Sequence, residues 1–326
     1  MSKAYDSVNL DLLKLALERI QIPSQLCNII TNLLTNRTNR VITNLGLTEP
    51  YNINNSIDQG ETITPLLWRI YYDPLINKIS TFYQGYTMSA TCKDSILTYK
   101  YKNLKVSSSV LAYMDDILWI TNSKSNLESI IQTATSFYQM ANIQINPHKS
   151  VLITNTKKQS HLNFINSSIQ PQQPNIPFKF LGCWFTLDGK QTQQTKLITN
   201  EISHLTNTLK TKHITNKQVS YIINTVIIPI LEYHIHNIIL SQTTCNKILS
   251  SYLSVAKHKS NFATTTPNST LLNHNIYGIK NIWDIQLQYH ISNFLTRLCD
   301  TRLLGISTQI RLQQLQNNLW STTNIL

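Results

Sequence analysis

The segment from Val110 to Ile120 reads V-L-A-Y-M-D-D-I-L-W-I and places the strongest constraint on the fold. Two short, β-rich apolar runs flank the adjacent carboxylates of Asp115 and Asp116. This pattern predicts two buried strands joined by a hairpin, with Met114, Asp115 and Asp116 at its tip. Negative charges held against a hydrophobic sheet are costly unless a cation compensates for them, and a divalent metal pair does so in phosphoryl transfer. The alternative is an ordinary Asp-Asp turn at a solvent-exposed hairpin tip.

The chain is strongly basic. Its 326 residues include 28 lysines and arginines against 16 aspartates and glutamates, a formal net charge of +12. Such an excess predicts a polyanionic partner, nucleic acid before a membrane surface. Between Lys190 and Ser260, eight lysines stand against only Glu201 and Glu232. These lysines are at positions 190, 196, 210, 212, 217, 247, 257 and 259. A solvated lysine face that serves solubility is the alternative for this stretch.

Cysteine spacing and hydropathy indicate in which cellular compartment the protein is expected. The five cysteines, at positions 27, 92, 183, 245 and 299, include no C-x-x-C pair, which argues against a disulfide framework or a zinc ribbon. The chain does not open with a signal peptide. Its most apolar window, 221–240, contains Asn224, Pro229 and Glu232, which argues against a membrane span. We therefore expect an intracellular protein, in the nucleus or the cytoplasm, that is not secreted and has no membrane partner.

Hydrophobic periodicity divides the chain into a mixed part and a helical part. Before residue 190 it predicts helices and short strands, with a polar loop over residues 166–177. The expected helices are 10–20, 24–34, 65–79 and 125–141, and the expected strand regions are 41–57, 97–106, 110–120 and 178–185. Later in the chain only helices are expected, over 192–211, 215–240, 242–257, 283–300 and more weakly after residue 307. The change near residue 190 is the best predicted domain boundary.

Five short motifs follow one another along the chain. They are K-A-Y-D-S-V at residues 3–8, I-D-Q-G-E-T-I-T-P-L-L-W at 57–68, A-Y-M-D-D at 112–116, I-N-P-H-K-S at 145–150 and F-L-G at 180–182. In this order they resemble motifs A to E of the reverse transcriptases of non-LTR (LINE-type) retrotransposons. Together the motifs are highly specific, although each alone would be weak. The helical remainder, with I-I-P-I-L-E-Y at 227–233, resembles the family's thumb more loosely.

The resemblance implies an α+β fold. A polymerase palm of antiparallel sheet packed on helices would occupy residues 1–187, and a helical thumb-like region residues 188–326. It also implies RNA-directed DNA synthesis, in which a primer 3′-hydroxyl attacks the α-phosphate of a dNTP between two metal ions. The implied partners are an RNA template, a DNA primer and dNTP, and the implied cofactor is Mg²⁺, or Mn²⁺ in its place. Template preference, oligomeric state and protein partners are left open by the sequence.

The same resemblance assigns roles at the catalytic centre. Asp115 and Asp116 would be catalytic carboxylates and metal ligands, since Mg²⁺ takes hard oxygen ligands and keeps several waters. Tyr5 would lie under the incoming sugar and exclude a 2′-hydroxyl. Gln59 and Gly60 would form a turn that approaches the nascent base pair closely. The alternatives are a tyrosine that only packs against a helix start and an ordinary Q-G turn.

Two further assignments concern the leaving group and the primer. Lys149 matches the lysine of motif D, a candidate proton donor or charge partner for the leaving pyrophosphate. Phe180, Leu181 and Gly182 would position the primer strand. An exposed lysine without a role and an ordinary core strand are the alternatives.

One position departs from the family's pattern. The metal-binding aspartate of motif A lies five residues before the aromatic residue at the Tyr5 position, and counting back from Tyr5 places it one residue before Met1. Asp11 is too late to replace it, and Asp6 follows the aromatic residue and would instead cap or orient the helix that starts near Val8. The fingers region is also not in the sequence. We therefore expect a truncated, catalytically impaired copy, because positioning and charge neutralisation supply most of phosphoryl-transfer catalysis.

The sequence leaves three functions open. The leading one is the palm and thumb of a reverse transcriptase, the second is a non-enzymatic nucleic-acid-binding remnant that uses the basic helices, and the third is an unstable pseudogene product. A group II intron protein is the alternative among related polymerases, but no maturase or zinc-finger endonuclease signature supports it. The polymerase interpretation requires the Asp-Asp turn to lie near residues 3–5, because the strands of motifs A and C are neighbours in the family's palm.

Overall fold

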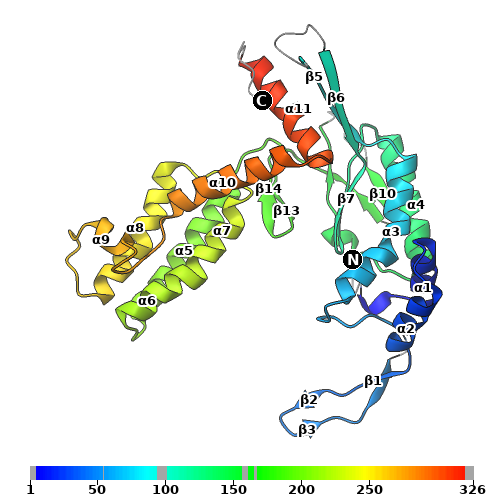
Figure 1. The fold of residues 1–326 in the computed structure, drawn as a ribbon, viewed down its shortest axis with the longest axis horizontal. Coiled ribbons are helices and arrows are strands. Elements are labelled where there is room, and N and C mark those ends of the chain that lie inside the picture. Colours follow the sequence, from blue (N-terminus) through cyan, green and yellow to red (C-terminus); the bar gives the residue numbers. More distant parts are fainter. Residues whose placement is uncertain (1–4, 54, 94–100, 156–160, 165–166, 320–326) are drawn as a thin grey trace. The chain divides into compact units, whose positions relative to one another are not determined.

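The computed structural model describes residues 5–53, 55–93, 101–155, 161–164 and 167–319 (Figure 1). These residues form two compact units, one within 1–172 and 310–326 and the other within 173–309. Each unit has its own hydrophobic core. Helices and short, mostly antiparallel strands give way to a helical region, which confirms the α+β class. The boundary predicted after residue 187 concerns the family's domains and stays a prediction.

Helix α3, Thr64–Phe82, is the centre of the first unit. It packs against α1 (Leu10–Arg19), α4 (Lys124–Met140) and strand β7 (Val110–Tyr113), while α2 (Ser24–Leu34) packs against α1. The buried side chains of α3 recur at helical spacing and include Leu67, Trp68, Tyr71, Tyr72, Leu75 and Ile79. A single helix face therefore organises the core of this unit.

The start of α1 corrects one expectation. The side chain of Asn9 accepts hydrogen bonds from the backbone N–H groups of Asp11, at 2.9 Å, and Leu12, at 3.1 Å. Asn9 is therefore the N-cap, and the prediction that Asp6 caps this helix is wrong. Asp6 lies one turn earlier, in the short 3₁₀ helix Tyr5–Ser7.

Two-stranded ladders make up the β structure that the model describes in the first unit. The antiparallel pairs are β1 (Arg37–Asn39) with β4 (Tyr51–Ile53), β2 (Ile42–Thr43) with β3 (Gly46–Leu47), β5 (Tyr86–Lys93) with β6 (Tyr101–Ser108), β7 with β8 (Asp116–Trp119), and β10 (Leu162–Phe164) with β11 (Ser167–Ile169). The parallel pair is β9 (Leu152–Ile153) with β12 (Pro171–Gln172). Figure 1 shows the β1–β4 and β2–β3 ladders as one arm that extends away from α2.

Two strand expectations are wrong. The segment 166–177 is not a loop throughout, because it contains β11 and β12. The strands flanking Asp115 are not buried: only one face of the β7–β8 ribbon packs on the core, and Leu111 and Tyr113 on the other face are 51% and 64% exposed. A ribbon of two strands leaves one face uncovered unless another element lies over it.

The second unit is helical apart from the hairpin of β13 (Phe178–Phe180) and β14 (Cys183–Phe185). Its helices are α5 (Thr192–Thr211), α6 (Asn216–Ile222), α7 (Ile228–Ile235), α8 (Gln242–Lys259), α9 (Asn268–Leu272) and α10 (Ile282–Cys299), and α11 (Leu303–Asn318) crosses the limit between the units. A π-helical segment, Ile223–Ile227, joins α6 to α7 just before Pro229, whose missing N–H interrupts the α-helical ladder. Helix α8 packs against α5 and α6, and α10 packs against α7 and α8.

None of the described helices combines the length and the apolar character needed to cross a bilayer.

The base of the β7–β8 hairpin depends on close backbone contact at Gly85. This residue is buried, and a Cβ atom added to it would lie 2.0 Å from the carbonyl oxygen of Ser108 and 2.3 Å from the nitrogen of Ser109. The carbonyl of Ser109 in turn accepts a hydrogen bond from the backbone N–H of Ile120 at 2.9 Å. Gly85 therefore allows β5 to begin directly against the residues that close the hairpin.

We expect Gly85→Ala to destabilise the protein by about 1–3 kcal/mol or more, because backbone atoms must move to admit the methyl group. Urea unfolding followed by circular dichroism measures the loss. Ser89→Ala, on the exposed side of the same strand, is the control and should leave the unfolding midpoint nearly unchanged. Equal midpoints for Gly85→Ala and wild type would contradict this account of the contact.

Candidate active site

The Asp-Asp motif forms a tight hairpin in the first unit. Tyr113 pairs with Asp116, so Met114 and Asp115 are the two central residues of the turn. Met114 has φ 54°, and a positive φ at the first central position alone is the type II′ pattern. A non-glycine residue in this region costs of order 1–3 kcal/mol and persists where the surrounding structure imposes it. Met114 packs on the core of the unit, which supplies that constraint.

Both carboxylates of the turn are solvent-exposed. The expectation of charges buried against a hydrophobic sheet is therefore wrong, and the exposed-turn geometry is the one observed. Val110, Ile117 and Trp119 send their side chains toward the core, while Asp115 and Asp116 remain in water. Because these carboxylates are not desolvated, they need no cation for the fold, and they remain accessible to one.

Tyr5 lies beside this turn and also contacts motif B. Its carbonyl oxygen accepts a hydrogen bond from the backbone N–H of Ile57 at 3.2 Å, and its ring meets that of Trp68 edge to face, with centroids 5.6 Å apart. Burial raises the pKa of the Tyr5 hydroxyl, and the negative charge of Asp115 raises it further. The predicted proximity of Tyr5 and the Asp-Asp turn is confirmed, whereas Lys3 and Ala4 lie outside the described residues.

Gln59 and Gly60 occupy an exposed turn that is anchored to the same region. Gly60 has φ 105°, which few other residues adopt, and no atom lies within 4 Å of where its Cβ would be. The preceding residues are fixed: Ser56 N–H donates to the carbonyl of Val8 at 3.1 Å, and Arg37 forms an ion pair with Asp58. Motif B therefore begins against motif A.

Lys149 stands apart from these contacts. It is exposed at the end of the 3₁₀ turn Pro147–Lys149, and its backbone N–H donates to the carbonyl of Asn146 at 3.2 Å. In the part of the chain that the structure describes, no ion pair joins Lys149 to Asp115 or Asp116. Among the described residues, Tyr5 thus connects the start of motif B, at Ile57, with the Asp-Asp turn, and no ion pair links Lys149 to that turn.

The F-L-G motif forms a β-turn in the second unit. Phe180 pairs with Cys183, and the two central residues, Leu181 and Gly182, have φ values of 47° and 77°, the type I′ pattern. The hydroxyl of Tyr233 on α7 donates a hydrogen bond to the carbonyl of Leu181. A Cβ on Gly182 would lie 3.0 Å from that hydroxyl oxygen. Glycine is therefore required here both by the backbone conformation and by the approach of Tyr233.

A buried glutamine holds the same hairpin on the helices. Gln194 on α5 is 2% exposed; its Oε1 accepts from the backbone N–H of Trp184 at 2.9 Å, and its Nε2 lies 2.8 Å from Nδ1 of His234. Since Oε1 must accept from Trp184, Nε2 is the donor and His234 Nδ1 carries no proton. Burial lowers the pKa of His234, an effect that the charge of Glu201 partly opposes.

The structure thus reveals positioning residues that the sequence did not single out: Trp68, Gln194, Tyr233 and His234. Trp68 and Tyr233 are inside segments that resemble the family, in motif B and in the I-I-P-I-L-E-Y stretch, but neither segment indicates which side chain it contacts. Gln194 has no signal in the sequence, because its two partners are 10 and 40 residues away along the chain.

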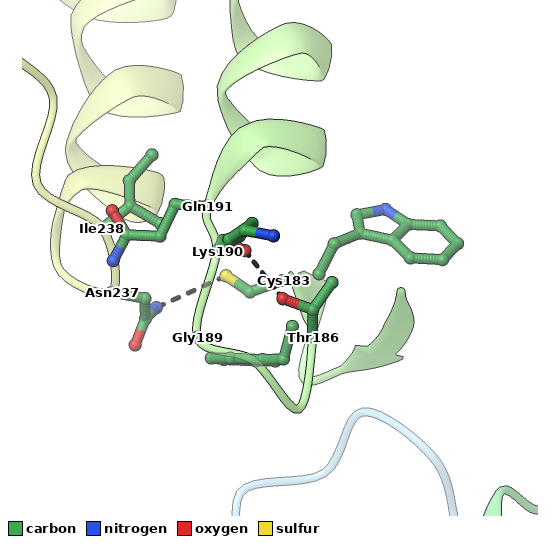
Figure 2. Close-up of a pocket in the computed structure, with 9 residues that line it drawn as sticks. Cys183, Thr186, Gly189, Lys190, Gln191, Asn237 and Ile238 are labelled. Atoms are coloured by element: carbon green, nitrogen blue, oxygen red, sulfur yellow. Dashed lines mark hydrogen bonds between the residues drawn. The ribbon is translucent and has the colours of Figure 1, made fainter. Parts of the chain in front are cut away.

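A small pocket lies next to the hairpin (Figure 2). Figure 2 shows Asn237 facing Cys183, with its Nδ2 3.4 Å from the sulfur, and the hydroxyl of Thr186 bonded to the carbonyl of Lys190. Asp188 organises the loop, and hydrogen bonds from Thr186 and Lys190 lower its pKa to about 2. The volume of about 70 Å³ is far below the roughly 300–1,000 Å³ of ligand pockets, so we assign no ligand to it.

Comparison with known proteins identifies the class. The family model for reverse transcriptase (RNA-dependent DNA polymerase) matches residues 1–185, a range that includes all five motifs. The chain therefore belongs to the reverse transcriptase family.

Within that family the chain resembles the non-LTR type. It is 21% identical over 195 residues to the retrovirus-related Pol polyprotein from type-1 retrotransposable element R2 of Popillia japonica. The aligned part is 57% of this chain and 30% of that polyprotein, so the chain spans less than a third of its relative's length.

The hydrogen bond of His234 predicts a dependence of stability on pH. The folded-state pKa is below the ordinary value of 6.5, so the unfolded chain binds the proton more readily. The contribution of His234 to the free energy of unfolding is therefore fully present above pH 6.5 and is lost as the pH falls below that value. Urea midpoints measured between neutral and mildly acidic pH should decrease in wild type and decrease less in His234→Gln.

His213→Gln is the matched control, since His213 is exposed on the loop after α5. It should show the same acid-induced decrease as wild type. If the three proteins lose stability in parallel, the effect does not come from His234.

Proposed function

We propose that this chain forms the palm and thumb-like part of a reverse transcriptase that copies RNA into DNA. The observation that supports it best is the convergence of three motifs at Tyr5. Its backbone is bonded to Ile57 of motif B, its ring packs on Trp68 of the motif B helix, and its hydroxyl is within the electrostatic reach of Asp115 in motif C. A tyrosine that merely packed on a helix start would not need to lie near enough to Asp115 for that charge to raise its pKa.

Each described residue can then be given a task in the reaction. The Tyr5 ring, held edge-on by Trp68, would form the floor under the dNTP sugar and exclude a 2′-hydroxyl. The exposed Gln59–Gly60 turn would approach the new base pair, where the absence of a side chain on Gly60 leaves space. The Leu181–Gly182 turn, fixed by Tyr233 and Gln194, would hold the primer strand. Lys149 is proposed only as a charge partner for pyrophosphate.

The carboxylates of the Asp-Asp turn have part of what a divalent metal ion needs. Asp115 and Asp116 offer adjacent, hydrated oxygen donors, which suit Mg²⁺, an ion that keeps several waters. In the described ranges no group of three or more His, Cys, Asp or Glu side chains could hold a metal ion. The two residues fit part of a Mg²⁺ site; when bound, the ion would neutralise phosphate charge and polarise the primer hydroxyl.

The family's pattern needs one more carboxylate. It belongs five residues before Tyr5, a position that is not among these 326 residues. Asp6 lies inside the 3₁₀ helix Tyr5–Ser7 and Asp11 lies in α1 beyond the Asn9 cap, so neither occupies the strand position. We propose that a polypeptide of these 326 residues alone is catalytically impaired, because two metal ions and their phosphates would face only Asp115 and Asp116.

Primer extension on an RNA template tests both statements. We expect no extension by the 326-residue polypeptide, extension by a polypeptide that adds a relative's fingers and motif A strand before Tyr5, and none when Asp115→Ala is placed in that longer protein. Each reaction is run with Mg²⁺ and with Mn²⁺. Extension by the 326-residue polypeptide that is lost on Asp115→Ala would show that another acid completes the site.

A second function, nucleic-acid binding without catalysis, is favoured by the charge of the helical unit. No aspartate or glutamate occurs in residues 202–231 or 233–283, whereas these segments contain seven lysines, at 210, 212, 217, 247, 257, 259 and 280. A surface with one sign of charge attracts polyanions regardless of their sequence. Both functions would share this surface, and only the polymerase requires Asp115.

We expect binding of a primed RNA–DNA duplex to weaken steeply with salt. If six phosphates are contacted, affinity should fall on the order of 10³-fold between low and moderate salt. Fluorescence anisotropy at several salt concentrations provides the slope. Asp115→Ala should bind equally well, since it removes no positive charge. An affinity independent of salt would exclude the lysine surface as the binding site.

A further inference from the structure

A groove on the second unit has the chemistry of a nucleotide site. It has a volume of about 510 Å³, within the roughly 300–1,000 Å³ of ligand pockets. One wall is the face of α6 that carries Lys217 and Tyr221, four residues apart, and the other is the loop with Ile276 and Tyr277. The groove is far larger than the pocket beside Cys183, and none of its residues belongs to the five motifs.

The two walls are fixed by hydrogen bonds. Asn216 donates from Nδ2 to the hydroxyl of Tyr277 at 3.2 Å. Asn224 donates to the carbonyl of Gly278 at 2.9 Å and accepts from the backbone N–H of Lys280 at 3.1 Å. Asn216 of α6 and Asn224 of the following π-helical segment thus each bridge to the loop, so the groove is preformed.

The lining combines exposed apolar surface with positive charge. Tyr221 is 69% exposed and Ile276 is 57% exposed, so both present apolar surface to a ligand in the groove. The ring of Tyr277 is held edge to face by Phe262, with centroids 5.8 Å apart. Lys217 is exposed beside Tyr221, and the surrounding segments 202–231 and 233–283 contain no acid. An aromatic platform beside a lysine is how proteins hold unpaired nucleotides.

We propose that this groove binds one nucleotide of single-stranded nucleic acid, with the base on Tyr221 and the phosphate at Lys217. A duplex would not occupy it, because its bases are stacked on each other and present no free face. The occupant would be an unpaired part of a template or of a displaced strand. The proposal rests on the nucleic-acid function proposed above and adds to it a preference for unpaired strands.

Binding of short fluorescein-labelled oligothymidylate and oligouridylate to the full chain tests the site. We expect Tyr221→Ala to weaken both about tenfold, as the loss of one stacked base does, and to change the affinity for a blunt duplex less than twofold. Tyr221→Phe should retain binding. Phe82→Ala, which removes a ring 75% exposed at the end of α3, is the matched control and should have no effect. Lys217→Gln should reduce the salt slope on the single strand by roughly 0.7.

A readout independent of folding is photocross-linking of wild-type protein to oligouridylate that contains 5-iodouridine. The modified residue should be Tyr221. Cross-links elsewhere, or equal losses for single strand and duplex in Tyr221→Ala, would overturn the proposal. Competition by polyglutamate as effective as that by oligouridylate would also overturn it, since it would show that only charge is recognised. Unchanged duplex binding distinguishes these results from failure of the nucleic-acid function itself.

Discussion

The aromatic face of α3 is the interaction on which the first unit depends. Trp68, 1% exposed, stacks on Tyr72 with centroids 5.5 Å apart and also packs edge to face with Tyr5. The hydroxyl of Tyr72 is 2.5 Å from that of Tyr138, which fastens α3 to α4. Aromatic side chains bury about 150–250 Å² each, so this row supplies much of the core. The same row also fixes the position of the Tyr5 ring. The same packing therefore folds the unit and positions the residue that would meet the sugar.

The hairpin beside Tyr5 separates the needs of the fold from those of chemistry. Its apolar side chains, Val110, Ile117 and Trp119, contact the core, and its carboxylates are exposed, so the fold is stable without an ion. The positive φ of Met114 is the strained feature of this turn, directly before Asp115.

The sequence predicted what depends on neighbours along the chain. Helices α2 and α5 have the expected bounds because periodicity and stop signals are local, and the two hairpins at the Asp-Asp and F-L-G turns were expected for the same reason. Pairing between segments far apart in the sequence was not predicted. Leu152 of β9 pairs with Pro171 of β12, and β12 lies in a segment that the sequence predicts to be a polar loop. The exposure of one face of the β7–β8 ribbon was also not predicted, because the burial of a strand depends on which other element packs over it. In the site, family resemblance predicted the proximity of Tyr5 and Asp115, but no pattern indicated that Gln194 joins Trp184 to His234.

The lysines of the second unit divide into those that hold the fold and those free to contact a polyanion. Lys259 donates to the carbonyls of Lys210, at 2.8 Å, and Lys212, at 2.7 Å, at the end of α5, and Lys257 donates to the carbonyl of Thr264 at 3.1 Å. Each ammonium group has three N–H donors, so these lysines contribute to the positive field but keep fewer donors for a phosphate than a lysine without such bonds. The salt dependence of the affinity reports the number of phosphates contacted, whereas long-range attraction depends on the net charge. The number of phosphates bound should therefore be smaller than the number of lysines, with exposed residues such as Lys217 supplying the contacts and the net positive charge of the unit supplying the attraction.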